Sequence, residues 1–383
     1  MEIKIPIGVN IQVDDVGWQS GADERHLGRP SRSGLPRRHH PNDVLAVNEI
    51  GKRLGTKILC NLVLGEWDKN NRLRGVPHFT WDAKGWDAAA KLDMTYTEAY
   101  LDALEGSEYI DYGLHSLLHS YYDDNGNLLD LKICYPFVRK NAQGVCERYP
   151  LSNEEFALMV DLFYQIYDDW GFKKKISVFE SPCGCIGTPD SDYNRDFARI
   201  LYPRGIRVWQ WAGWPEEAMV REGMTYLQCT ALAHEWNAYD FDPEYHYDAF
   251  LKEGMHSNLC GHLTNFIRFH PEKNFEYVDK WVAYFRRLTS HYGAVLAQDA
   301  LSSASQSLYA NYATLAEGAD GTRVDLAPVL AQGSPILMDE LFVSAKGTLT
   351  SCQGGTLTHY EARPDHNVYR VTLHQGATSI VVK

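Results

Sequence analysis

Two short stretches of this chain combine residue types that could bind a metal ion and move a proton. Asp14 and Asp15 are adjacent carboxylates at the end of an apolar stretch, residues 3–13, that predicts a buried strand. His115 and His119 are four residues apart, a spacing that would place two imidazoles on one side of a helical turn. One carboxylate with two imidazoles forms a three-ligand set for a divalent ion that leaves room for water and substrate. The second carboxylate is then free to accept a proton.

Each stretch also has a purely structural explanation. An Asp-Asp pair after a strand can cap a helix or form a turn, and a histidine pair can be solvated or lie at the edge of the core. Both stretches follow apolar strand patterns, and they occur together in one chain. This combination favours a shared metal site.

Both stretches resemble motifs of a known enzyme family. Asp14–Gly17 (DDVG) is similar to the first motif, TFDDG, of the polysaccharide deacetylases, the NodB-homology domain of carbohydrate esterase family four. His115–His119 (HSLLH) matches that family's second motif, His-Ser/Thr-x-x-His, at every specified position. The family is a distorted (β/α) barrel of about seven strands that uses a divalent metal to remove N- or O-acetyl groups from sugars.

The resemblance implies a role for each of these residues. Asp14 would be the general base, and Asp15, His115 and His119 would bind the metal. Zn²⁺ is the ion that such a donor set favours, with Co, Ni and Mn as alternatives. The expected activity is metal-dependent hydrolysis of an acetyl group on a sugar or polysaccharide, with N-acetyl favoured over O-acetyl.

The third and fourth motifs of the family are changed in this chain. Phe179–Gly184 (FESPCG) resembles the third motif, FRPPYG, but Glu180 replaces the arginine that orients the base. Gly213 precedes Trp214 where the fourth motif has an aspartate, so both members of that charged support are replaced. Cys183 would still offer its backbone N–H to the oxyanion, because that donor does not depend on the side chain.

The fifth motif of the family is an apolar strand that ends in a histidine, the general acid. Residues 263–269 predict such a strand, which makes His270 the expected acid and His262, at its other end, the weaker candidate. Residues 19–42 form a loop rich in arginine, histidine and proline that could close over a ligand. The side chains expected to contact substrate are Glu180, Trp18, Trp214, Arg37 and His234.

Strand and helix patterns alternate through residues 1–300, which predicts an α/β fold with a distorted (β/α)7-type barrel. The expected strands after the first are 57–64, 109–114, 175–180, 206–214 and 225–232, and the expected helices are 41–54, 93–105, 153–169, 243–254 and 274–291. The candidate residues follow predicted strands, and the carboxyl ends of barrel strands share one face. Residues 301–383 predict a helix and a small antiparallel β-sandwich-like accessory domain.

Composition excludes several other classes. The formal net charge of −13 argues against nucleic acid as a partner. No apolar run approaches the ~20 residues that span a bilayer, and no signal-peptide pattern follows Met1, so we expect a cytoplasmic protein with no membrane partner. Eight cysteines are too few for a disulfide scaffold. A carbohydrate substrate is expected, and the oligomeric state is left open.

Two other functions fit parts of the sequence. A metal-free glycoside hydrolase could use Glu180 and Glu235 as its carboxylate pair, and it would release a reducing sugar instead of acetate. A non-catalytic relative of the deacetylases could bind sugar without turning it over. Sensitivity to chelators and the identity of the product would separate these three functions.

Overall fold

The structure is a computed structural model of the chain. It describes residues 2–17, 35, 37–76, 79, 86–118, 120–122, 128–130, 139–140, 146–147, 152–181, 192–211, 217–232, 239–244 and 254–383. Among the helices in these ranges, none has the length and apolar character needed to cross a membrane.

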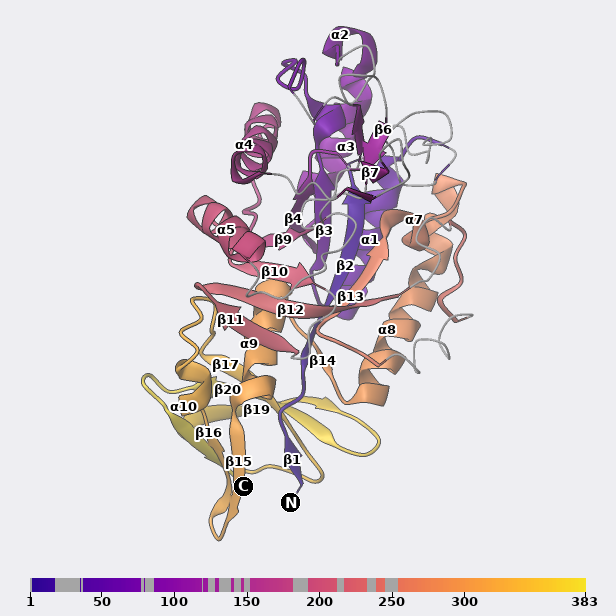
Figure 1. Ribbon diagram of the computed structural model, residues 1–383. Helices are drawn as coiled ribbons and strands as arrows, with labels where there is room; N and C mark the ends of the chain where they lie inside the picture. The colour runs from indigo at the N-terminus through magenta and orange to yellow at the C-terminus, as the bar shows by residue number, and fades with distance from the viewer. Residues whose placement is uncertain are drawn as a thin grey trace.

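Seven parallel strands in the described ranges form a closed barrel (Figure 1). Each strand pairs with the next, and pairing between the last strand and the first closes the ring. The alternation of strands and helices therefore predicted the α/β barrel correctly. In order around the barrel, the strands are β2 (Gly8–Val16), β3 (Ile58–Val63), β4 (Ile110–Ser116), β9 (Val178–Glu180), β10 (Val208–Trp211), β12 (Met224–Ala231) and β13 (Asn258–His262).

Helices connect the strands and cover the outside of the barrel (Figure 1). Local signals set their ends: α1 has Pro41 in its first turn and stops at Gly55, whose φ is 72°. Ser152 caps α4 by accepting the backbone N–H of Glu155. The helices are α1 (Pro41–Leu54), η2 (Gly65–Trp67), α2 (Ala88–Lys91), α3 (Met94–Glu105), α4 (Asn153–Trp170), α5 (Asp192–Leu201), η3 (Tyr202–Arg204), α7 (Leu263–Phe266), η4 (Pro271–Tyr277) and α8 (Val278–Tyr292).

The predicted strand over 263–269 is wrong. The strand, β13, comes earlier, and His262 ends it; residues 263–266 form the short helix α7. The sequence of β13, Asn-Leu-Cys-Gly-His, lacks the apolar alternation of a half-buried strand. Asn258 and Cys260 are nevertheless buried, because their side chains bond to Asn10 and Asp14 inside the barrel, whose interior is polar.

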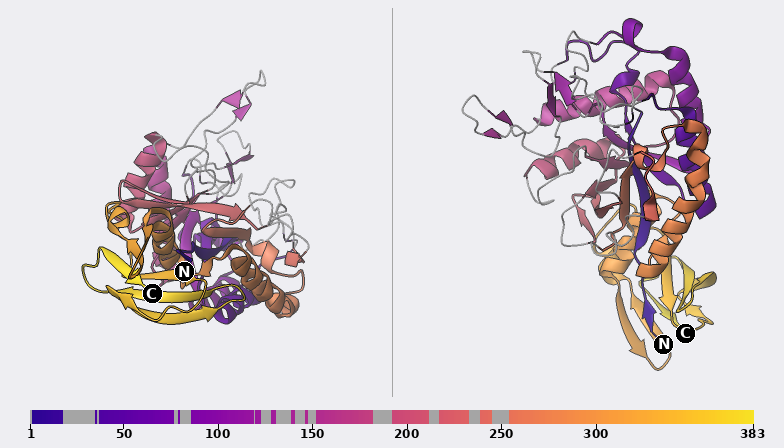
Figure 2. Two further views of the ribbon diagram at one scale, coloured as in Figure 1. Left: turned by 90° about the horizontal axis from the view of Figure 1, so that it is seen from below. Right: turned by 90° about the vertical axis from the view of Figure 1, so that its right-hand side faces the viewer.

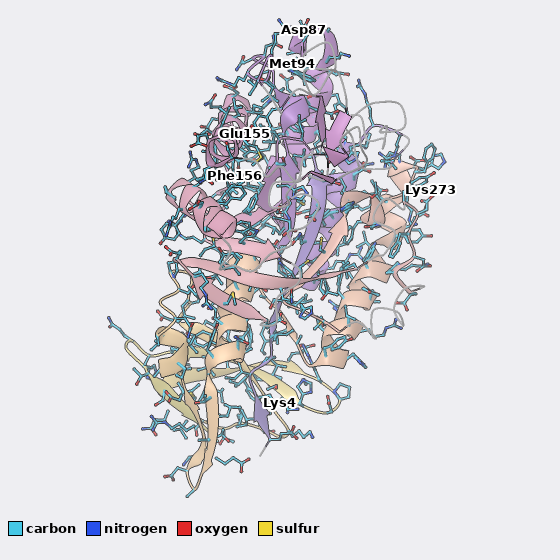
Figure 3. The ribbon with its side chains drawn as sticks, in the orientation of Figure 1. Lys4, Asp87, Met94, Glu155, Phe156 and Lys273 are labelled. Atoms are coloured by element: carbon cyan, nitrogen blue, oxygen red, sulfur yellow. The ribbon has the colours of Figure 1, made fainter. Side chains whose placement is uncertain are left out.

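Two antiparallel sheets gather at one end of the molecule, where both chain termini also lie (Figure 2). This confirms the predicted antiparallel C-terminal region. One of its strands, however, comes from the other end of the sequence: β1 (Ile3–Lys4) pairs with β17. Figure 3 shows Lys4 among these sheets, far from Asp87 and Met94 at the opposite end. The first sheet has the order β1, β17 (Glu340–Ala345), β20 (Asn367–Leu373) and β19 (Gly355–Ala362), and the second β15 (Thr314–Gly318), β16 (Gly321–Asp325), β21 (Ser379–Val382) and β18 (Cys352–Gln353).

Shorter elements complete the described structure. β11 (Ala218–Arg221) pairs antiparallel with β12, and β14 (Val295–Leu296) pairs with the start of β2. Two small hairpins lie between β4 and α4, and the helix α10 (Ala327–Leu330) follows β16. The hairpin strands are β5 (Ser120–Tyr122), β6 (Leu128–Asp130), β7 (Arg139–Lys140) and β8 (Cys146–Glu147).

The helix α9 (Ala300–Tyr312) joins the C-terminal sheets to the floor of the barrel, by which we mean the amino-terminal ends of its strands. Ser303 Oγ donates to the carbonyl of Gly8, and Gln306 Nε2 donates to the carbonyls of Pro6 and Phe342. A Cβ on Gly8 would lie 2.7 Å from Gln306 Cβ, so this close crossing requires glycine. One buried apolar cluster spans helix, floor and sheets and includes Leu59, Val178, Val208, Leu227, Ala304, Leu308 and Leu341.

Candidate active site

Both chemistry-bearing stretches lie at irregularities of the barrel strands. Between Val13 and Val16, β2 advances three residues while β3 advances two, so Asp14 and Asp15 share a β-bulge. Asp15 has a φ of 62°, in the left-handed region that few residues other than glycine adopt. A bulge re-aims side chains, which lets adjacent carboxylates serve the same space. His115 is likewise the extra residue where β4 advances two positions and β3 one.

Asp15 and His115 face each other in a buried setting. Asp15 Oδ1 lies 3.7 Å from His115 Nε2, and neither residue is more than 2% exposed. The other ring nitrogen, Nδ1, lies 2.8 Å from the backbone carbonyl of Glu180. A carbonyl can only accept, so Nδ1 carries the hydrogen in this contact and Nε2 is directed at the carboxylate. Metal-binding histidines are commonly oriented in this way.

His115 belongs to a strand rather than a helix, so the predicted helical turn does not hold for it. A helix would have brought His115 and His119 to one side through their four-residue spacing. In the structure, the bulge in β4 and the carbonyl of Glu180 determine where His115 lies.

His262 approaches the same carboxylate from another strand. It is the last residue of β13, its backbone pairs with Asp14, and its Nδ1 lies 3.5 Å from Asp15 Oδ2. His270, the histidine favoured by the sequence, follows α7 instead of ending a strand. Its side chain is 58% exposed, and its Nδ1 lies 3.6 Å from Glu272. Of these two histidines, His262 is the one that the structure brings to the aspartate pair.

Asp14 is held by three hydrogen-bond donors that the sequence did not single out. Gln12 Nε2 and Asn61 Nδ2 donate to Oδ1 at 2.8 and 2.7 Å, and the thiol of Cys260 donates to Oδ2 at 3.0 Å. A hydrogen bond with Cys229, followed by burial and the charge of Asp14, raises the pKa of the Cys260 thiol well above its ordinary value. The thiol therefore stays protonated and remains a donor. The sequence does contain a signal for such donors: polar residues, such as Gln12 and Asp14, at alternate positions of an otherwise apolar strand.

Arg37, which was expected to contact substrate, has a guanidinium that bonds to other residues of the chain. Its guanidinium forms a two-pronged ion pair with Asp43 and also donates to the carbonyls of Arg268 and Phe269. These contacts tie the start of α1 to the segment that follows α7. Glu180, at 7% exposure, ends β9 at the carboxyl face of the barrel. The remaining predicted site residues lie outside the described ranges: His119, Trp18, Cys183, Trp214, His234 and Glu235.

His39, in the segment expected to be a polar loop, is a further buried histidine near this site. It is 1% exposed, and its ring nitrogens have no hydrogen-bond partner within the described ranges. Burial lowers its pKa to about 4, although the charges of Asp43 and Asp15 oppose the effect. The ring is therefore neutral at neutral pH.

The described donors fit a divalent ion in part. Asp15 and His115 supply one carboxylate oxygen and one correctly oriented imidazole nitrogen, the donor types that Zn²⁺ prefers. No set of three His, Cys, Asp or Glu side chains in the described ranges is arranged to hold a metal ion. The third ligand implied by the motif, His119, lies outside those ranges.

No protein-family model matches this chain, and no curated protein sequence matches it. The resemblance to polysaccharide deacetylases therefore rests on the motif residues alone.

Proposed function

We propose that this protein is a metal-dependent hydrolase that removes acetyl groups from a sugar or polysaccharide, with N-acetyl favoured over O-acetyl. The observation that carries the proposal is the buried contact between Asp15 Oδ1 and His115 Nε2. The match of HSLLH to the second deacetylase motif supports the same assignment. Zn²⁺ is the favoured ion, with Co, Ni and Mn as alternatives.

The contact favours a cation between the two side chains. The two atoms lie 3.7 Å apart in a buried site, and both are atom types that bind divalent metals. At the usual ligand distances of ~2.0–2.2 Å, one ion could reach both atoms. Metal analysis of the purified protein therefore tests whether an ion binds at this contact.

The residues around this contact suit the roles of general base and general acid in the hydrolysis of the acyl group. A bound divalent ion supplies Lewis-acid polarisation of the acyl carbonyl. Asp14, held by donors from the barrel interior, accepts the proton of the attacking water. His262 replaces His270 as the proposed acid that protonates the departing nitrogen or oxygen, because its ring lies beside Asp15.

The first test is the metal content of the purified full-length chain beside Asp15→Ala and His115→Ala variants. We expect about one transition-metal ion per wild-type chain and little in either variant. Acetate should be released from N-acetylated amino sugars or oligosaccharides by the metal-loaded protein and not after chelation. A wild-type protein that takes up no metal, even on reconstitution with Zn, Co, Ni or Mn, would overturn the proposal.

Three further variants test the roles assigned to Asp14 and His262. Asp14→Asn should keep the metal and lose turnover. His262→Gln should lose activity far more severely than His270→Gln, because His262 is the histidine beside Asp15. The opposite ranking would return the acid role to His270.

A glycoside hydrolase is the second candidate, because Glu180 is a buried acid at the carboxyl face of the barrel. Its expected partner, Glu235, lies outside the described ranges. This enzyme would release reducing sugar in the presence of a chelator, and Glu180→Gln would abolish that release. Acetate as the sole product would exclude it.

A further inference from the structure

We propose that Gln12, Asn61 and Cys260 form a neutral support that positions Asp14 as the proton acceptor. The inference rests on the proposed function, in which Asp14 is the base. Glu180 stands where the resemblance implies an arginine that would orient this base. Another set of donors must therefore perform that task.

The support holds the carboxylate from three neighbouring strands. Gln12 is on β2, Asn61 on β3 and Cys260 on β13, and these strands are consecutive in the barrel. All three residues are at most 3% exposed, so water does not compete for the bonds. The three donors occupy three of about four lone-pair sites on the carboxylate, which leaves one for the attacking water.

The donors orient Asp14 without neutralising it. Two amides and a protonated thiol carry no net charge, whereas an arginine would form an ion pair with the base. The three bonds therefore restrict the rotation of the carboxylate without placing a positive charge beside it. Holding a reacting group in one orientation lowers the barrier, because less ordering is left for the transition state.

Gly113 on β4 makes room for this arrangement. A Cβ at Gly113 would lie 1.8 Å from Asn61 Oδ1 and 3.0 Å from Asn61 Cγ. The obstruction is the end of a side chain, so a methyl group there would push the Asn61 amide aside with little effect on the backbone. The strand that carries His115 therefore also provides the space that lets Asn61 reach Asp14.

The matched comparison is between Asn61→Leu and Asn10→Leu. Both residues are buried amides of the barrel interior, but Asn10 donates to Asn258 and not to Asp14. We expect Asn61→Leu to lower kcat about 10- to 100-fold, since bonds to charged groups are the strong ones, with KM changed less than about twofold. Gln12→Leu should behave in the same way, and Asn10→Leu should leave kcat near the wild-type value.

A double-mutant cycle tests whether Gly113 acts through Asn61. Gly113→Ala should lower kcat in the wild type but have no further effect in an Asn61→Ala background. Additive losses would show that the glycine serves another purpose. Gly113→Ala also covers the case in which a leucine variant fails to fold.

A measurement without substrate separates this inference from the proposed function. The infrared S–H stretching band of Cys260 can be isolated by subtracting the spectrum of Cys260→Ala. Asp14→Asn should shift this band to higher frequency, because a neutral amide oxygen is a weaker acceptor than a carboxylate. Asn61→Leu should shift it to lower frequency, because the carboxylate then shares its charge with one donor fewer, whereas Asn10→Leu should leave the band in place. If Asn61→Leu, Gln12→Leu and Gly113→Ala all leave the band unchanged, the support is refuted. If the band responds but the wild type releases no acetate, the support stands and the deacetylase proposal fails.

Discussion

His39 should make the stability of the fold depend on pH in a defined window. Burial lowers its pKa to about 4, against about 6.5 for an exposed histidine. Between pH 6.5 and pH 4 the imidazole of His39 is protonated in the unfolded chain but neutral in the folded protein. The free energy of unfolding must therefore fall as the pH falls from 6.5 to 4. At about 1.36 kcal/mol per pH unit, the difference between the two pKa values corresponds to about 3 kcal/mol of unfolding free energy.

The perturbation that isolates this effect is His39→Leu. The ring nitrogens have no hydrogen-bond partner within the described ranges, so an apolar replacement removes none of the described bonds. The variant should match or exceed the wild-type stability at pH 7 and should exceed it by about 3 kcal/mol near pH 4.

The assay is urea unfolding followed by tryptophan fluorescence, with wild type and variant compared at each pH from 7.5 to about 4. Comparing the two proteins cancels the contributions of the many carboxylates that also titrate. His270→Leu is the control, because it removes a histidine whose side chain is 58% exposed and leaves the buried ring of His39 in place. Parallel stability curves for wild type and His39→Leu would refute the reasoning that the buried ring stays neutral.

Three further predictions concern the scaffold. Gly8→Ala should destabilise the protein by about 1–3 kcal/mol in urea unfolding, because the new Cβ would lie 2.7 Å from Gln306 Cβ and 2.8 Å from the carbonyl oxygen of Ser303. Cys60, whose pKa burial raises to about 12, should resist alkylation in the native protein and react after unfolding, as read by mass spectrometry. Lys174→Met should lower the thermal midpoint, because the ammonium donates to three backbone carbonyls around the end of α3 and the start of β4 that would lose their partner; an unchanged midpoint would argue against that role.

Elements with local signals were predictable from the sequence. The helix expected over 41–54 is α1, because Pro41 and Gly55 mark its ends. The helix expected from 153 is α4, which Ser152 caps. Such signals depend on neighbouring residues and need no knowledge of the fold.

Features that depend on distant partners were not predictable in this way. The bulges at Asp15 and His115 are defined by register against β3, which no local pattern encodes. Strand β13 was missed because Asn258 and Cys260 face a polar interior, where the usual apolar signal is reversed. For the same reason the sequence singled out Asp14 as a candidate residue but not the side chains that hold it.

The pairing of β1 with β17 and the placement of α9 under the barrel have a consequence for how the protein is made. During translation, every barrel strand is synthesised before α9, the helix that packs against the amino-terminal ends of these strands. Until α9 is made, the apolar surface that it covers is exposed; this surface includes Leu59, Val178 and Val208. Chaperones bind intermediates that expose such surfaces. Premature termination after residue 300 should therefore yield an insoluble or rapidly degraded product, although every candidate catalytic residue has already been translated.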